Sequence, residues 1–448
     1  MLYKWKLLAN SIKSQYSMII RKPLVLGTFL VLISFFALSS PDFQETQSKK
    51  THAIEFVNPL KIQAQKEAAY IYKSRKAVLA KEIAAYFEDM INKRLIVGAG
   101  VSIVQGDSIL LKEGFGKRNV FKNDRVDSET VFRLGSLSKG FTGILAGIEV
   151  KDGALKWDDK LVDLMPEFQL KSKLNAEKLT LSNVLSHTTG VPYHCYTNLV
   201  EDGIELPEIA SRFNIINTIA RPGKVYSYQN AMFALSGEMM HTATGQTIQQ
   251  LLQNKIFTPL NMKTASTDYE ALIKTNNYAY PHKNTRKGWN RLPVNKKYFN
   301  AVAAGGINAS AADMGKWMRF LLGHNERVLD SESIARVFKP QVDIPDAHKY
   351  YQRWKGHLRS SYAYGWRIHE FVDAETGDQS KMIHHGGSVS DFRNEIALFP
   401  GEDLGISVLF NSLTPLASFV IPELHEIVNK VMNIPVDNLE LGKLATAK

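Results

Sequence analysis

The sequence predicts an α/β protein in which a sheet flanked by helices is interrupted by a mainly helical subdomain. Two strand-like stretches, at 97–104 and 108–116, precede a long region whose apolar residues recur at helical spacing. Strand patterns return only after residue 362, and an amphipathic helix at 416–431 follows them. This order indicates one sheet that contains strands from both the N-terminal and the C-terminal part of the domain, with helices inserted between them.

Composition places the chain among ordinary globular proteins. Its 448 residues are 44% hydrophobic and 22% charged, which allows a substantial core. The net charge of +11 would suit a protein that binds nucleic acid or acidic lipid, but five of the positive charges precede the first apolar run, where they favour membrane targeting. We therefore expect no nucleic-acid partner. The single cysteine, Cys195, excludes a disulfide-stapled fold.

The N-terminal region predicts export. A basic segment at 1–22 precedes an apolar segment at 23–39, and a polar, lysine-rich linker follows at 40–77. The apolar segment fits a signal peptide or a short membrane anchor, and the length of the basic segment favours the anchor. A buried core helix is the other interpretation. We expect a protein anchored in the inner membrane and facing the periplasm, or secreted to the periplasm if the segment is cleaved.

The remaining chain is predicted to form one domain at 78–434, with a helical subdomain at about 154–300 and a tail at 435–448. Apolar residues at 83–91 recur at helical spacing, and Gly106 lies in the expected turn between the first two strands. A helix is expected from Ser136 to about Lys151. The later strands are expected at 362–371, 381–385, 391–399 and 405–411.

The first candidate catalytic pair is Ser136 and Lys139, three residues apart at the expected start of a helix. At this spacing both side chains lie on one helix face. A partly buried lysine gives up its proton near neutral pH and can then activate a serine hydroxyl, while the helix N-terminus favours an oxyanion. A serine cap followed by a solvated lysine is the alternative interpretation, because S-x-x-K arises often by chance.

A second group follows the Pro222-Gly223 turn, where Tyr228 and Asn230 stand two residues apart. A tyrosine can relay protons, and an asparagine can hold a substrate amide while it fixes the lysine. An ordinary turn followed by a half-buried aromatic residue is the alternative interpretation.

The third group is the segment Ile383-His384-His385-Gly386-Gly387-Ser388, near the end of a predicted strand. Glycines there let a substrate backbone approach closely, and an exposed N–H can complete an oxyanion hole with that of Ser136. The sequence contains no H-E-x-x-H motif and no carboxylate cluster near these histidines. It also lacks a Walker loop and a dinucleotide fingerprint, so we expect neither a metal nor a cofactor.

In this order the three groups resemble the penicillin-recognising serine hydrolases, which include class C β-lactamases, D-Ala-D-Ala carboxypeptidases, and related esterases and D-aminopeptidases. The resemblance spans roughly residues 80–432 and implies a β-lactamase/transpeptidase-like fold. Other segments share it, namely Asp152-Gly153 with Asp158-Asp159, Leu179-Thr180-Leu181, Ser186-His187-Thr188-Thr189-Gly190, Thr244-Gly245, Pro259-Leu260-Asn261-Met262, Ala304-Gly305-Gly306 and Asp313.

The resemblance also implies roles for the first two groups. Ser136 resembles the acylated nucleophile and Lys139 its proton acceptor. Tyr228 and Asn230 resemble the Y-x-N pair that shuttles the proton and grips the substrate amide. His187 lies in a segment that is structural in this family, although a histidine has a general aptitude for base chemistry.

In the third group, His385 and Gly387 resemble an H-x-G motif that helps to bind substrate, with Ser388 as the second oxyanion donor. His384 and Gly386 spell the same pattern in an alternative register, but the distance to the next strand favours His385. Class C β-lactamases usually carry K-T-G here. A mostly neutral imidazole holds a substrate carboxylate less well than a lysine does.

The resemblance therefore implies a hydrolase that forms an acyl-enzyme on Ser136 and cleaves an amide-type bond in a β-lactam or a D-amino-acid peptide. A carboxylesterase on the same fold is an alternative, and a non-catalytic binding protein of the cell envelope is an alternative of another class. Expected partners are a small molecule or a cell-wall peptide, and the membrane through the N-terminal segment. Substrate choice is expected to depend on the loops at 193–206 and 343–362.

Overall fold

The computed structural model describes residues 59–436 and residue 439. The segments predicted at 1–22 and 23–39, the first half of the linker predicted at 40–77, and most of the tail predicted at 435–448 lie outside these residues. Among the helices of the described part, none combines the length and the apolar character needed to cross a bilayer.

Within these residues, eight strands form one antiparallel sheet in the order β2-β1-β12-β11-β10-β9-β8-β7. The early strand β1 pairs with the late strand β12, as the predicted fold requires. A pair β3-β6 and a hairpin β4-β5 stand apart from this sheet. The strands are β1 Gly98–Gln105, β2 Ser108–Gly116, β3 Val131–Arg133, β4 His282–Thr285, β5 Gly288–Arg291, β6 Asn308–Ser310, β7 Val342–Asp343, β8 His357–Tyr362, β9 Arg367–Val372, β10 Gln379–Val389, β11 Phe392–Phe399 and β12 Leu404–Phe410.

Between β3 and β7 the chain is mainly helical, as predicted. The helices of the described part are α2 Pro59–Asn92, α3 Ser138–Lys151, α4 Leu161–Leu164, α5 Lys173–Ala176, α6 Leu181–Leu185, α7 Thr197–Glu201, α8 Leu206–Arg212, α9 Asn230–Thr244, α10 Ile248–Leu252, α11 Tyr269–Lys274, α12 Val302–Gly305, α13 Ala311–Leu321, α14 Ser331–Val337 and α15 Val420–Met432. Short helical turns are η1 Gly135–Leu137, η2 Phe213–Ile215, η3 Gln253–Phe257, η4 Tyr350–Arg353, η5 Pro400–Glu402 and η6 Pro415–Ser418.

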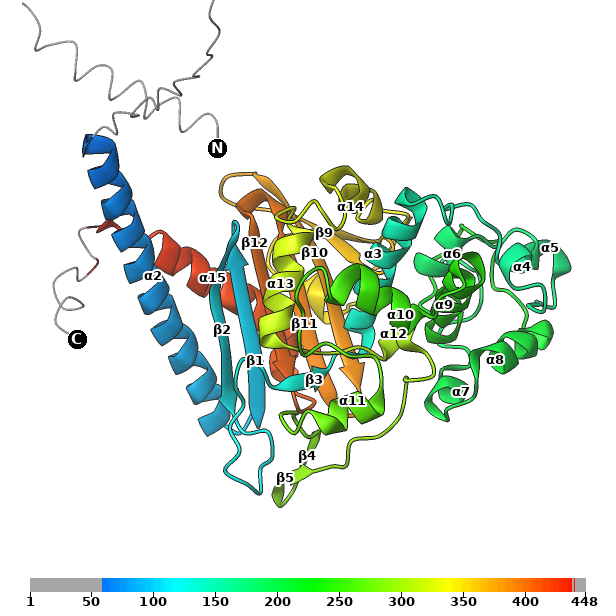
Figure 1. Cartoon of the computed structure of the whole chain (residues 1–448), viewed down its shortest axis with the longest axis horizontal. Coiled ribbons are helices and arrows are strands. Elements are labelled where there is room, and N and C mark those ends of the chain that lie inside the picture. The colour runs from blue at the N-terminus through cyan, green and yellow to red at the C-terminus, as the bar shows by residue number, and fades with distance from the viewer. Residues whose placement is uncertain (1–58, 437–438, 440–448) are drawn as a thin grey trace, which may run out of the picture. The chain divides into compact units, whose positions relative to one another are not determined.

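Helices cover both faces of the sheet (Figure 1). On one face lie α2 and α15, and Phe87 of α2 stacks on Phe115 of β2 with ring centroids 4.8 Å apart. On the other face lie α3 and α13, where Phe141 stacks on Trp317 at 3.9 Å. The hydrophobic core that contains Phe141 and Trp317 continues into the helical subdomain. Helix α3 therefore lies where the sheet meets that subdomain.

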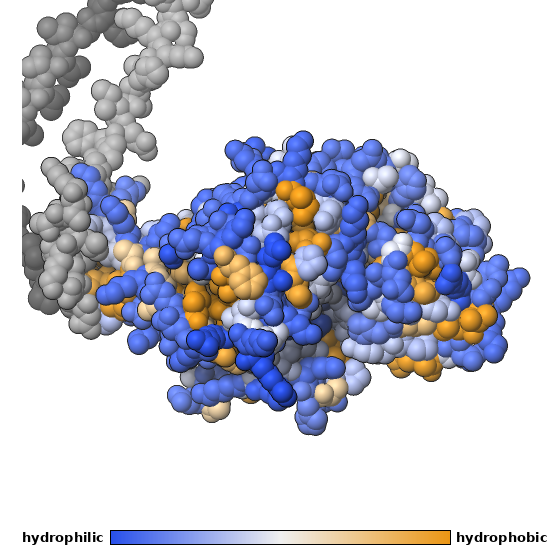
Figure 2. Space-filling model, turned by 90° about the horizontal axis from the view of Figure 1, so that it is seen from below, coloured by the Kyte–Doolittle hydropathy of each residue, from blue (hydrophilic) through white to orange (hydrophobic). Residues whose placement is uncertain are grey.

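The surface seen in Figure 2 is mostly hydrophilic, and hydrophobic residues lie there in small separate groups. Scattered apolar side chains of this kind are normal on a folded protein. This face therefore gives no sign of an apolar docking surface.

The bounds of some elements differ from the sequence prediction. The helix expected at 83–91 belongs to α2, which begins at Pro59 within the predicted linker, in a stretch rich in alanine and lysine that favours helix. The single strand predicted at 362–371 is wrong, because the end of β8, a turn and β9 occupy these residues. In that turn the N–H of Ala363 donates to the carbonyl of Trp366 at 2.8 Å, and Gly365 supplies a φ of +80°.

Candidate active site

Ser136 lies at the junction of the sheet and the helical subdomain. It is the middle residue of η1, which runs directly into α3, so α3 begins at Ser138 and not at Ser136. Strand β10 approaches this turn so closely that a side chain on Gly135 would lie 2.7 Å from the backbone oxygen of Ser388. Gly135 also has a φ of +55°. A glycine at this position therefore lets β10 lie against the backbone of Ser136.

The side chain of Lys139 is completely buried beside Ser136. Its Nζ lies 3.4 Å from the Oγ of Ser136. Two oxygens lie closer, Oδ1 of Asn230 at 2.8 Å and the backbone oxygen of Ala304 at 2.7 Å. Burial, with a contribution from the charge of Arg367, holds the pKa of Lys139 well below its usual range.

These contacts leave one position free on the Lys139 nitrogen. A neutral amine has two N–H groups and one lone pair. The oxygens of Asn230 and Ala304 accept the two N–H groups, so the lone pair is left for the hydroxyl of Ser136. The geometry suits a neutral lysine that accepts the serine proton.

Tyr228 and Asn230 reach this site from the N-terminus of α9. Asn230 is the first residue of that helix, and its Nδ2 donates to the hydroxyl of Tyr298 at 3.0 Å. The Tyr228 ring centroid lies 4.9 Å from the Nζ of Lys139. Burial raises the pKa of Tyr228 to about 12, although a hydrogen bond with Ser136 acts in the opposite direction. The hydroxyl therefore keeps its proton at neutral pH and can donate it.

His385 packs behind this tyrosine. Its ring centroid lies 6.4 Å from that of Tyr228, and its Nε2 accepts a hydrogen bond from the Tyr362 hydroxyl at 3.0 Å. Its Nδ1 donates to the backbone oxygen of Gly386 at 2.7 Å. Burial and nearby positive charges hold the pKa of His385 well below its usual range, so the ring is neutral.

The neighbouring residues of β10 alternate between its two faces. His384 is fully buried on the face opposite to His385, where it contacts His369 and Glu395. Gly387 faces the entry to η1, and a side chain there would lie 2.2 Å from the backbone oxygen of Leu134. Of the two registers, the one that begins at His385 brings the histidine to Tyr228.

A cavity of about 710 Å³ opens at Ser136. Tyr228, Asn230, Gly386 and Ser388 form part of its wall. The two loops that were expected to shape the substrate pocket also line it, with Tyr193, His194, Thr197 and Glu201 from the first and Ile344, Pro345, Ala347, Lys349, Tyr350 and Tyr351 from the second.

The sequence reasoning missed two arginines in this wall. Arg393 pairs with the buried carboxylate of Glu395 at 2.5 Å. Arg367 lies 5.1 Å from the ring centroid of Tyr351, and its Nε and Nη1 are buried without a hydrogen-bond partner. One signal in the sequence could have revealed these arginines. Polar residues occupy alternate positions in two of the strands, namely Arg367 with His369 and Arg393 with Glu395.

His187 contacts Tyr228 and the residue that follows it. Its ring centroid lies 4.2 Å from that of Tyr228, and its Nδ1 accepts the backbone N–H of Gln229 at 3.1 Å. It is fully buried and adopts a φ of +58°. These contacts fix the residues that lead into α9.

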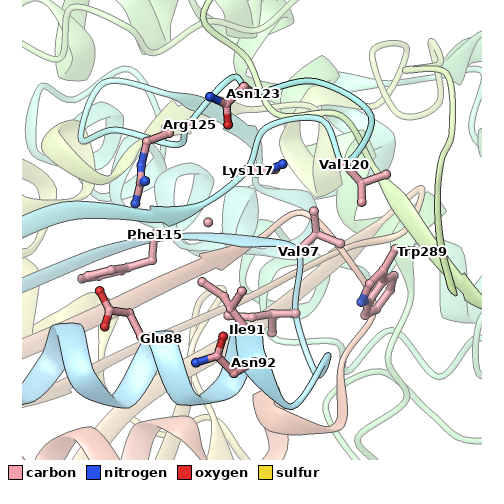
Figure 3. Close-up of a pocket in the computed structure, with 12 residues that line it drawn as sticks. Glu88, Ile91, Asn92, Val97, Phe115, Lys117, Val120, Asn123, Arg125 and Trp289 are labelled. Carbon is pink, nitrogen blue, oxygen red and sulfur yellow. The ribbon is translucent and has the colours of Figure 1, made fainter.

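A second cavity, of about 470 Å³, lies between the end of α2 and strand β2 (Figure 3). Ile91, Val97 and Phe115 line it, with the ring of Trp289 at one side and polar groups around them. It contains no serine or cysteine beside a base. In the part of the chain that the structure describes, no group of three or more His, Cys, Asp or Glu side chains could hold a metal ion.

Comparisons with known proteins identify the family of the chain. The model of the Beta-lactamase family matches residues 83–425. The unguisins hydrolase ungD' of Aspergillus campestris is 25% identical over 351 residues, which are 76% of this chain and 62% of that protein. Protein flp of Staphylococcus aureus (strain COL) is 24% identical over 364 residues, 78% of this chain and 66% of its own. The chain thus spans less than two thirds of the length of both relatives.

A solved structure shares the fold. The octameric penicillin-binding protein homologue from Pyrococcus abyssi superposes with a TM-score of 0.66 at 22% identity, over 78% of this chain and 77% of that one. This TM-score shows that the two chains share a fold. The chain therefore belongs to the Beta-lactamase family.

Proposed function

We propose that this protein forms an acyl-enzyme on Ser136 and hydrolyses an amide-type bond in a β-lactam or a D-amino-acid peptide. The observation that carries the proposal is the environment of the Lys139 amine. It is buried, its N–H groups are taken by two oxygens, and the Oγ of Ser136 lies 3.4 Å away. An amine held in this way is a base at neutral pH and activates a neighbouring hydroxyl.

In the proposed reaction, the Oγ of Ser136 attacks the substrate carbonyl carbon and its proton passes to the Nζ of Lys139. The backbone N–H groups of Ser136 and Ser388 are proposed to hold the oxyanion, since β10 lies against η1 at this point. Tyr228 then passes a proton from Lys139 to the leaving nitrogen, and Asn230 holds the substrate amide. A water molecule attacks the acyl-enzyme, with the same groups acting in reverse.

The guanidinium of Arg367 supports a substrate that carries a carboxylate. It lines the cavity, and its Nε and Nη1 have no hydrogen-bond partner among the described residues. A carboxylate in the cavity can form a charge-assisted contact with a guanidinium. A β-lactam acid or a peptide with a terminal carboxylate supplies this group, whereas a simple ester leaves the guanidinium unpaired.

Replacing Arg367 with glutamine is expected to raise KM for an anionic cephalosporin or a D-Ala-D-Ala peptide by about 10- to 100-fold, because a charge-assisted hydrogen bond is lost. The KM for an uncharged nitrophenyl ester should stay within about threefold of the wild-type value, since this substrate makes no such bond. Steady-state kinetics on both classes measures the difference. Arg286→Gln, in the exposed β4-β5 turn, is the matched control. An equal rise in KM for charged and uncharged substrates would contradict carboxylate recognition by Arg367.

The proposed function is tested by comparing three substrates with the purified full-length protein. They are a chromogenic cephalosporin, a D-Ala-D-Ala peptide and a short-chain nitrophenyl ester. The proposal expects the highest kcat/KM for the cephalosporin or the peptide. A higher value for the ester would favour the carboxylesterase, and an inert protein that also resists covalent serine probes would favour a binding protein.

The proposal includes export through residues 1–39, based on their sequence alone. Cell fractionation of the full-length protein, and of a form that lacks these residues, tests this location.

A further inference from the structure

A line of hydrogen-bonded side chains crosses four neighbouring strands of the sheet. It begins at the half-buried His357 of β8, whose Nε2 lies 2.7 Å from the Oγ of Ser360. That oxygen lies 2.7 Å from the Nδ1 of His369 on β9. The Nε2 of His369 lies 3.1 Å from the Nδ1 of His384 on β10. The Nε2 of His384 lies 2.7 Å from Oε2 of Glu395 on β11. These five residues are called the histidine relay below.

The last residue of the histidine relay lies directly behind the wall of the active-site cavity. The hydroxyl of Tyr350 donates to Glu395 at 2.9 Å, and Arg393 pairs with the same carboxylate at 2.5 Å. Tyr350 and Arg393 both line the cavity that contains Ser136. A side chain on Gly386 would lie 3.1 Å from the carboxylate oxygens, so a glycine in β10 makes room for Glu395.

The interior of the histidine relay is closed to solvent. Ser360 is 2% exposed, and His369, His384 and Glu395 are not exposed at all. Aromatic residues of η4 and the segment that follows it cover the imidazoles. The ring of Tyr351 lies 4.9 Å from that of His369, and the ring of Trp354 lies 5.2 Å from that of His384. Of the five residues, only His357 is partly open to solvent.

The hydrogen bonds fit two complete sets of donors and acceptors. When Glu395 is ionised it only accepts, so His384 and His369 each carry the proton on Nε2, and Ser360 donates to His369 and accepts from His357. When Glu395 carries a proton it donates to His384, and every donor in the line reverses, so both buried imidazoles carry the proton on Nδ1. The same heavy-atom geometry serves both sets. Burial holds the pKa of both imidazoles well below the usual range, which keeps them neutral.

We propose that the histidine relay moves a proton between solvent at His357 and the carboxylate of Glu395, and thereby sets the charge that Arg393 presents to the substrate. Solvent protonates Nδ1 of His357, and Nε2 of His357 gives its proton to Ser360. Each member then passes one proton to the next, until Glu395 becomes a carboxylic acid. One proton enters at His357, one O–H bond forms on Glu395, and no other group changes its charge.

Charged groups around Glu395 explain how its protonation changes the electrostatic potential in the cavity. Arg393 on β11 and Arg367 on β9 face the carboxylate from the cavity side, Tyr350 of η4 donates to it, and His384 of β10 lies behind it. Burial raises the pKa of Glu395 to about 7, although both arginines oppose this shift. Below that pH the carboxylic acid leaves Arg393 without a counter-ion, so the cavity attracts an anionic substrate more strongly. Above it, Glu395 neutralises Arg393.

The test that does not depend on catalysis is a pH titration by NMR of the full-length protein with ¹⁵N-labelled histidine. Ring nitrogen shifts report which nitrogen carries the proton. His369 and His384 are expected to change from Nδ1–H to Nε2–H together as the pH rises through the midpoint of Glu395. A fixed tautomer for either ring across that midpoint would overturn the proposal.

Ser360→Ala interrupts the histidine relay with the loss of a single oxygen. An Nδ1–H on His369 would then be a buried donor without an acceptor. An unpaired buried donor costs more free energy than an unpaired buried acceptor. Both buried rings should therefore stay in the Nε2–H form, and the midpoint of Glu395 should fall by about one pH unit. Ser360→Thr keeps a hydroxyl and should restore the wild-type titration. An unchanged midpoint in Ser360→Ala would contradict the coupling.

The effect on substrate binding rests on the proposed function and is measured separately. With an anionic substrate, KM of the wild-type protein should rise as the pH passes the Glu395 midpoint, and Ser360→Ala should move this rise to lower pH. The pH dependence of kcat should follow Lys139 and should not move. If no substrate is hydrolysed the proposed function fails, while the NMR titration still decides the histidine relay. If substrates are hydrolysed but the tautomers stay fixed, only the histidine relay fails.

Discussion

Replacing Ser136 with alanine is expected to abolish covalent labelling by a fluorescent penicillin or a fluorophosphonate, and to lower kcat by at least about a thousandfold. The reason is that Ser136 Oγ is the atom that lies beside the buried amine of Lys139 and faces the cavity. Gel fluorescence after labelling, followed by mass spectrometry of the modified peptide, measures the first effect. The kinetics of the best of the three substrates measure the second.

Ser138→Ala is the matched control for this experiment. Ser138 is two residues away, fully buried, and its Oγ accepts the backbone N–H of Ile307 at 3.1 Å. This variant is expected to lose some stability and to keep the covalent label. A Ser136→Ala protein that is labelled as strongly as the wild type would show that another residue is the nucleophile.

The second large effect is expected at Lys139. Methionine has nearly the same length but no basic atom, so Lys139→Met should lower kcat/KM by about 10³- to 10⁴-fold. Arginine keeps a positive charge but cannot give up its proton, so Lys139→Arg should fail equally if the lysine is a base. In the wild type, kcat/KM should rise with pH as the amine loses its proton, at a pH well below the usual lysine range because burial lowers this pKa. In both variants, this rise of kcat/KM with pH should be absent.

Lys151→Met supplies the comparison on the same helix. Lys151 is exposed at the C-terminal end of α3, where it pairs with Asp330. Its replacement should leave kcat/KM and its pH profile unchanged. Activity in Lys139→Arg at the wild-type level would show that a positive charge, and not a base, is needed at this position.

Much of the fold was predictable because its signals are local. Strand-like stretches on either side of the turn at Gly106 predicted β1 and β2, and helical spacing predicted the inserted subdomain and α15. The turn between β8 and β9 was missed because Ala363 and Trp366 are apolar and look like strand residues. Nothing in the sequence around them but Gly365 marks the reversal.

The candidate site was predictable only in part, for a physical reason. Ser136, Lys139, Tyr228 and Asn230 belong to short motifs with a fixed spacing, so their sequence alone suggests chemistry. Arg367 and Glu395 act through contacts across strands, which depend on pairing register. A single arginine in a strand predicts a solvent-facing side chain unless the register is known. The close approach of Gly135 to β10 likewise involves segments that are distant in the sequence.

The pairing of β1 with β12 bears on how a newly made chain acquires its activity. Ala99 lies opposite Phe410, so this pair of neighbouring strands joins residues more than three hundred positions apart. Contacts of such long range form slowly, and a ribosome delivers β12 only after it has made more than three hundred residues beyond β1. Until then β1 presents an unpaired edge, which is prone to aggregate. We expect the nascent chain to be inactive and to need protection by chaperones until β12 has emerged and paired with β1.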